Sequence, residues 1–191
     1  KHLENGDEVY YIAFSTCEES VPKGLPKNIL EIEVKKSTKI LGIKSENLII
    51  KNYPVRNFNN YRQEILDELI KLNQLIRPNI VYIPSSYDIH QDHKVIHQES
   101  IRAFKNKSIL GYEFVWNSYV LKSNYFSILS KYHLEKKIKS IGCYKSQIKR
   151  MYSSKDFIIS SSKYKGLQVS SKYAEAFEII SSLCLDSLFK N

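Results

Sequence analysis

The sequence predicts an α/β protein in which helices cover a mainly parallel sheet in three layers. Short runs of β-branched and aromatic residues alternate with stretches of helical period along the 191 residues, and the connections between them are short. No internal repeat, low-complexity segment or linker interrupts this alternation. Length and pattern together predict a single domain over residues 1–191.

The first part of the chain supplies the clearest elements. In order, we expect a helix end at 1–6, a strand at 8–14, a helix at 27–43, a strand at 47–51, an amphipathic helix at 59–76 and a buried strand at 80–84. Gly6 and Gly42 stand where a helix needs a left-handed C-cap. Pro78 separates the last helix from the strand "IVYIP".

The second part repeats the alternation. We expect a helix from "DIHQDH" to about Lys105, strands at 109–116 and 118–122, a long helix at 132–152 and a C-terminal helix at 173–189. Each strand is followed by a short polar connection, which is typical of an α/β sandwich.

Composition excludes several classes of protein. The net charge of +9 favours anionic partners, but the lysines are scattered and no nucleic-acid recognition motif is present. We therefore interpret the charge as a solvated basic surface and predict no nucleic-acid binding. No apolar run approaches the ~20 residues of a membrane span. Cys17, Cys143 and Cys184 form no disulfide or thiolate pattern, which favours a reducing cytoplasm.

The stretch "DIHQDHKVIH", residues 88–97, holds three of the five histidines. If a helix begins near His90, then His90, His93 and His97 share one helix face. One imidazole can then bind a metal while its neighbour faces a substrate. Asp92 can hold an imidazole in one tautomer and raise its pKa, which suits general acid catalysis. Asp88 can cap the helix, with Gln91 completing a capping box.

An ordinary explanation of the same residues stays open. The aspartates can be helix caps alone, and His97 can be a solvated or packed side chain. A catalytic zinc normally has three protein ligands and one open position. His2 and His133 stand alone in the sequence, and no HExxH motif occurs. Spacing alone leaves both a metal site and a simple helix start possible.

Four stretches, taken together, are similar to a known family. The run "RPNIVYIPSSYDIHQDHKVIHQESIRAF" resembles the second motif of the LmbE-like, PIG-L family of zinc-dependent de-N-acetylases. "LENGDEVYYIAFS", "KKIKSIGCYKSQ" and "YAEAF" resemble three further stretches of that family in the same order. The resemblance covers nearly the whole chain and implies a Rossmann-like α/β/α fold.

The resemblance assigns roles residue by residue. His93 matches the third zinc ligand, His90 the catalytic histidine, and Asp92 the carboxylate that orients it. Asp88 matches the aspartate that opens the motif, where the residues alone indicate a helix cap. Arg56 falls where the family often has a substrate-binding arginine, although an ordinary surface arginine is an alternative.

The sequence departs from the family at one point. The family's N-terminal His-Pro-Asp-Asp-Glu signature, which supplies two zinc ligands and the general base, occurs nowhere in these residues. We expect an N-terminally incomplete domain whose full-length form carries that segment. The 191-residue chain by itself is expected to bind zinc weakly or not at all.

The activity implied by the resemblance is a metal-dependent amidase reaction. The expected substrate is a small molecule or glycan with an acetamido sugar of the N-acetylglucosamine type, free or linked to a nucleotide, lipid or glycan. The expected cofactor is Zn²⁺. The alternative is a non-catalytic, sugar-binding relative of the family that lacks the metal site.

Overall fold

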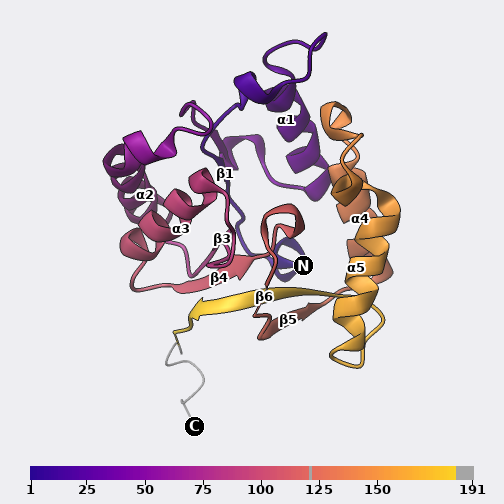
Figure 1. Cartoon of the computed structure of the whole chain (residues 1–191). Coiled ribbons are helices and arrows are strands. Elements are labelled where there is room, and N and C mark those ends of the chain that lie inside the picture. Colours follow the sequence, from indigo (N-terminus) through magenta and orange to yellow (C-terminus); the bar gives the residue numbers. More distant parts are fainter. Residues whose placement is uncertain (121, 184–191) are drawn as a thin grey trace. The chain divides into compact units, whose positions relative to one another are not determined.

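The computed structural model describes residues 1–120 and 122–183 and confirms the mixed α/β class (Figure 1). Its contacts divide the described chain into two compact units. The first unit comprises residues 1–55 and 127–175, and the second comprises residues 56–126 and the residues from 176 onward. Each unit contains its own helices packed on strands.

The first unit is built on a parallel strand pair and three helices. Strand β1 (Tyr11–Ala13) pairs with β2 (Leu48–Ile50). Helix α1 (Ile29–Leu41) contacts β2 and packs on α4 (Lys131–Ile141), which in turn contacts α5 (Lys155–Leu167) (Figure 1). At the contact between α1 and α4, the buried hydroxyls of Ser37 and Ser140 are hydrogen-bonded at 2.6 Å.

Glycines close two N-terminal elements as predicted. Gly42 adopts a φ of 92° after α1, and its N–H donates to the carbonyls of Thr38 and Lys39. The short 3₁₀ helix His2–Asn5 ends at Gly6 with a φ of 85°. Both conformations lie in the left-handed region, which favours glycine because it has no Cβ.

The larger sheet has the strand order β3-β4-β6-β5, and its strands β3 and β4 lie wholly in the second unit. The strands are β3 (Ile80–Pro84), β4 (Ser108–Tyr112), β5 (Tyr125–Ile128) and β6 (Ala174–Ser181). Strand β4 is parallel to β3 and antiparallel to β6. Helix α3 (Gln91–Ala103) contacts β3 and packs on α2 (Arg62–Ile76).

The core of the second unit follows the apolar stripe predicted for the helix at 59–76. Four residues of that stripe are buried in α2, namely Ile65, Leu66, Leu69 and Leu72. Residues of α3 and of strands β3 and β4 are buried in the same unit: Val95, Ile83, Ile109 and Leu110. This packing fixes α3, and with it the histidine cluster, in relation to β3.

Three sequence predictions for the C-terminal part were wrong. Residues 174–181 form β6 instead of a helix, and residues 184–189 of the predicted helix lie outside the described residues. At the start of β6, the buried Ala174 and Ala176 flank the less buried Glu175, an alternation with a period of two that suits a strand. The structure has no strand at 118–120 or at 122; the next strand, β5, begins at Tyr125.

The third wrong prediction is the long helix at 132–152. Helix α4 ends at Ile141, and two 3₁₀ turns follow it. Helix α5 was not predicted, and it begins where the hydroxyl of Ser154 accepts a hydrogen bond from the Phe157 N–H. Serine is a strong N-cap residue, so this start has a local signal in the sequence. Among the described residues, no helix is long and apolar enough to span a membrane.

Candidate active site

The histidine cluster lies at the carboxyl end of β3, as predicted. Strand β3 ends at Pro84, and α3 begins at Gln91 with His90 as its N-cap. The ring centroids of His90 and His93 are 4.6 Å apart. In an open α/β sheet, this edge is where ligands bind.

Asp88 is buried and contacts both His90 and His93. Its side chain is 1% exposed. One carboxylate oxygen accepts the backbone N–H of His90 at 2.8 Å, and the other lies 2.6 Å from Nδ1 of His93. The sequence indicated that Asp88 caps the helix. In the structure the N-cap is His90, and Asp88 accepts a hydrogen bond from the backbone N–H of that residue.

The contact with Asp88 decides what His93 can offer a ligand. A carboxylate accepts only, so Nδ1 of His93 donates and carries the proton. In a neutral ring, Nε2 is then left with a lone pair, and His93 is one-third exposed. A histidine that donates its other ring nitrogen to a carboxylate is the usual arrangement of a metal ligand.

His90 is held in the opposite tautomer. Its Nδ1 accepts the backbone N–H of Asp92 at 3.2 Å, so in the neutral ring the proton is on Nε2. Burial, followed by the nearby His93, lowers the pKa of His90, although Asp92 and Asp88 oppose the shift. The sequence analysis expected a raised pKa, and the desolvation of the ring reverses that expectation.

The carboxylate of Asp92 has partners that the sequence analysis did not anticipate. It is 3% exposed, and its oxygens accept the backbone N–H of Arg56 at 2.5 Å and that of Phe58 at 3.2 Å. Only the backbone of Asp92 is hydrogen-bonded to the His90 ring. That the Asp92 carboxylate orients His90 therefore stays a prediction.

Arg56 is brought to this site by the loop that precedes α2. Its backbone has a φ of 66°, in the left-handed region that few residues other than glycine adopt. The charge of Arg56 contributes, after burial and His93, to the lowered pKa of His90. The charge of Arg56 thus acts on His90, and the binding of substrate by Arg56 stays a prediction.

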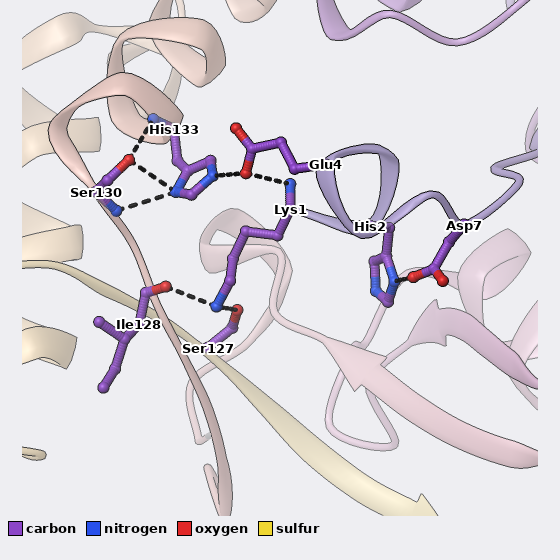
Figure 2. Close-up of polar contacts among 8 residues, drawn as sticks. All are labelled: Lys1, His2, Glu4, Asp7, Ser127, Ile128, Ser130 and His133. Atoms are coloured by element: carbon purple, nitrogen blue, oxygen red, sulfur yellow. Dashed lines mark hydrogen bonds and ion pairs between the residues drawn. The ribbon is translucent and has the colours of Figure 1, made fainter.

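His97 takes a different role from its two neighbours. Its Nδ1 donates to the carbonyl of Pro84 at 2.8 Å. It lines an open pocket of about 520 Å³ whose lining residues are Ser85, Ser86, Lys94, His97, Gln98 and Ile101. The remaining histidines belong to the first unit, where His2 pairs with Asp7 and His133 with Glu4 and Ser130 (Figure 2).

Two neighbours of the site were missed by sequence reasoning. The ring of Phe114 lies edge-on to His93, with 6.0 Å between centroids. The carboxylate of Glu178, on β6, accepts from the hydroxyls of Ser85 and Ser86 and from the Ser86 N–H. Glu178 directly follows "YAEAF", but the prediction of a helix there concealed its pairing with β4 and its contact with Ser85 and Ser86.

Comparison with known proteins identifies the family. The family model described as GlcNAc-PI de-N-acetylase, PIG-L, matches residues 1–104, which include the cluster at 88–97. The chain belongs to the PIG-L family. Among curated proteins, no match was found.

Solved structures share the fold at low identity. N,N'-diacetylchitobiose deacetylase from Pyrococcus horikoshii is 20% identical with a TM-score of 0.74, over 94% of this chain and 75% of that one. GalB, the 4-carboxy-2-hydroxymuconate hydratase of Pseudomonas putida KT2440, is 14% identical with a TM-score of 0.75, over 96% and 88%. The zinc-inhibited form of teicoplanin deacetylase Orf2 is 13% identical with a TM-score of 0.70, over 92% and 88%.

These neighbours carry out different reactions on one fold. Two are named as deacetylases and one as a hydratase. The fold therefore does not determine the reaction, which has to be inferred from the residues of the site.

His93 and Asp88 fit one position of a metal site. They supply an available imidazole nitrogen and the carboxylate behind it. Within residues 1–120 and 122–183, no group of three or more candidate ligands is assembled. A catalytic zinc would need ligands in addition to His93.

Proposed function

We propose that this protein is a zinc-dependent hydrolase that removes the N-acetyl group from an acetamido sugar of the N-acetylglucosamine type. The observation that carries the proposal is the pairing of His93 with the buried Asp88 directly beside His90. Membership of the PIG-L family supports the reaction class. The sugar can be free or linked to a nucleotide, a lipid or a glycan.

His93 would hold the metal through Nε2. The carboxylate of Asp88 keeps the proton on Nδ1 and fixes the plane of the ring. Because Asp88 also accepts the N–H of His90, the same carboxylate sets both histidines at the start of α3. The chemistry supplied by zinc, when bound, is polarisation of the amide carbonyl and activation of water.

His90 would act on the amide as a hydrogen-bond donor. With Nδ1 accepting from the backbone, Nε2–H is the group that can face the substrate. The lowered pKa of His90, caused first by burial, favours the neutral ring at neutral pH. A neutral imidazole can donate a hydrogen bond to the oxyanion that forms on the carbonyl oxygen, whereas only the protonated ring can pass a proton to the leaving amine.

Arg56 would bind the substrate beside these histidines. Its guanidinium carries five N–H donors and suits hydroxyl, phosphate or carboxylate oxygens. An anionic carrier group, such as a phosphate linked to the sugar, would gain most from this contact.

The test is deacetylation by the full-length natural protein. Acetate release is measured on N-acetylglucosamine, on a nucleotide-linked form and on a lipid-linked form, before and after chelation and after zinc is restored. We expect acetate release from at least one substrate, loss on chelation and recovery with zinc. A full-length protein that binds an acetamido sugar but retains no zinc and releases no acetate would favour the non-catalytic, sugar-binding alternative.

A further inference from the structure

The carboxylate of Asp92 is buried, and both of its oxygens have hydrogen-bond partners. It is 3% exposed, and each of its two carboxylate oxygens accepts a different backbone N–H. The donors belong to Arg56 and Phe58, which lie 36 and 34 residues earlier in the chain. The carboxylate thus connects the start of α3 to the loop that carries Arg56.

The loop needs such a connection because its backbone is strained at Arg56. A φ of 66° lies in the left-handed region, where the Cβ of an L-residue is crowded by the backbone, so the conformation persists only when surrounding contacts determine it. The N–H of Arg56 itself is one of the groups held by Asp92, at 2.5 Å. Phe58, held by the other oxygen, is 5% exposed and anchors the loop in the core.

We propose that Asp92 is a positioning residue that acts through Arg56, and this inference rests on the proposed function. Its carboxylate fixes the backbone at residues 56–58 and thereby the point from which the Arg56 guanidinium reaches the substrate. Its backbone N–H separately fixes the His90 ring. One buried residue therefore sets the distance between the substrate-binding arginine and the catalytic histidine.

Asp92→Asn is the informative substitution. Asparagine keeps the shape and the backbone N–H to His90, but it offers one acceptor oxygen where the carboxylate offers two. The NH₂ group of asparagine would face a backbone N–H, and it cannot accept a hydrogen bond from it. One hydrogen bond to residues 56–58 is lost, and the contact to His90 is kept.

The kinetic result expected is a split between KM and kcat. Misplacing Arg56 should raise KM about 10- to 100-fold, the loss expected for a contact to a charged group, while kcat changes far less. In an Arg56→Ala background, Asp92→Asn should raise KM little further, since both changes remove the same contact. Additive effects, or a fall in kcat with a shifted pH–rate profile and unchanged KM, would overturn the proposal.

A matched control separates positioning from stability. Glu99 is another buried carboxylate of α3, at 0% exposure, and its partners are Arg62 and Arg102. Glu99→Gln should lower the melting temperature at least as much as Asp92→Asn but leave KM unchanged. If KM follows melting temperature across both variants, Asp92 has only a structural role.

Amide hydrogen exchange gives a readout that does not depend on activity. The N–H groups of Arg56 and Phe58 should exchange faster in Asp92→Asn and at wild-type rates in Glu99→Gln. Unchanged exchange at residues 56 and 58 would overturn the positioning role. A wild-type protein without deacetylase activity would reject the proposed function alone, because exchange still tests the role of Asp92.

Discussion

Asp88 and His93 form a carboxylate–imidazole pair in which 2.6 Å separates Oδ2 from Nδ1, and the carboxylate is 1% exposed. The pair leaves the Nε2 atom of His93 to face a ligand. The predictions that concern zinc start from this relationship and apply to the full-length natural protein.

Asp88→Asn should weaken zinc binding about 10- to 100-fold, because the partner that orients His93 and raises its basicity is lost. Competition with a chromogenic chelator measures the affinity. Asp7→Asn is the control, since Asp7 makes a comparable 2.7 Å contact with His2 in the first unit (Figure 2). Equal affinities in wild type and Asp88→Asn would contradict the assignment.

His93→Ala should abolish both zinc retention and acetate release, because it removes a direct ligand. Zinc content after dialysis and acetate release are measured on the same preparation. His97→Ala should keep zinc, since Nδ1 of His97 donates to the Pro84 carbonyl outside the proposed metal position. Loss of zinc in His97→Ala would instead indicate a site shared by His93 and His97.

His90→Ala should keep zinc but lose about 10²- to 10⁴-fold in turnover, the range typical of a general acid or base. His90 is also the N-cap of α3, so the substitution removes a cap as well. His90→Asn keeps a capping oxygen without an imidazole and should lose as much turnover. Normal turnover in either variant would exclude His90 from the chemistry.

Glu99→Gln should lower the free energy of unfolding by about 1–3 kcal/mol, the cost of disturbing a buried group with charged partners. Glu99 is fully buried between Arg62 and Arg102, whose half-exposed side chains can be rehydrated when the carboxylate is lost. Urea denaturation measures the change. A variant as stable as wild type would show that this buried ion pair contributes no net stability.

Glu4 gives a pH dependence whose largest cause is its contact with His133. The hydrogen bond from His133 lowers the pKa of Glu4 below its usual 4.5, although desolvation opposes the shift (Figure 2). Because the folded-state pKa is the lower one, the stabilisation is present above about pH 4.5 and is lost as the pH falls through the folded-state pKa. The melting temperature of wild type should therefore exceed that of Glu4→Gln near pH 6, and the difference between the two melting temperatures should shrink toward pH 3. A difference independent of pH would contradict this.

The elements that sequence predicted well have local signals. Gly42 closes α1 because a left-handed C-cap favours glycine. Four residues of the predicted stripe are buried because helical period places them on one face: Ile65, Leu66, Leu69 and Leu72. The position of His90 and His93 followed from an apolar strand that ends just before them. These predictions depended only on residues that are close together in the sequence.

The partners of the two aspartates could not be predicted in the same way. Residues two apart on a helix do not face each other, so the carboxylate of Asp92 turns from the His90 ring to Arg56 and Phe58. Asp88, before the first turn, reaches His93 instead. Strand β6 was missed for the same reason, since its pairing with β4 joins residues far apart in the sequence.

The place of β6 in the sheet has a consequence for biosynthesis. In the order β3-β4-β6-β5, β6 follows the other three strands in the sequence but lies between two of them in the sheet. Until residues 174–181 have left the ribosomal tunnel, β4 has an unpaired edge, and Ser85 and Ser86 lack Glu178. The nascent chain can thus assemble the histidine pair early, but the loop between β3 and that pair is secured only after β6 has been made.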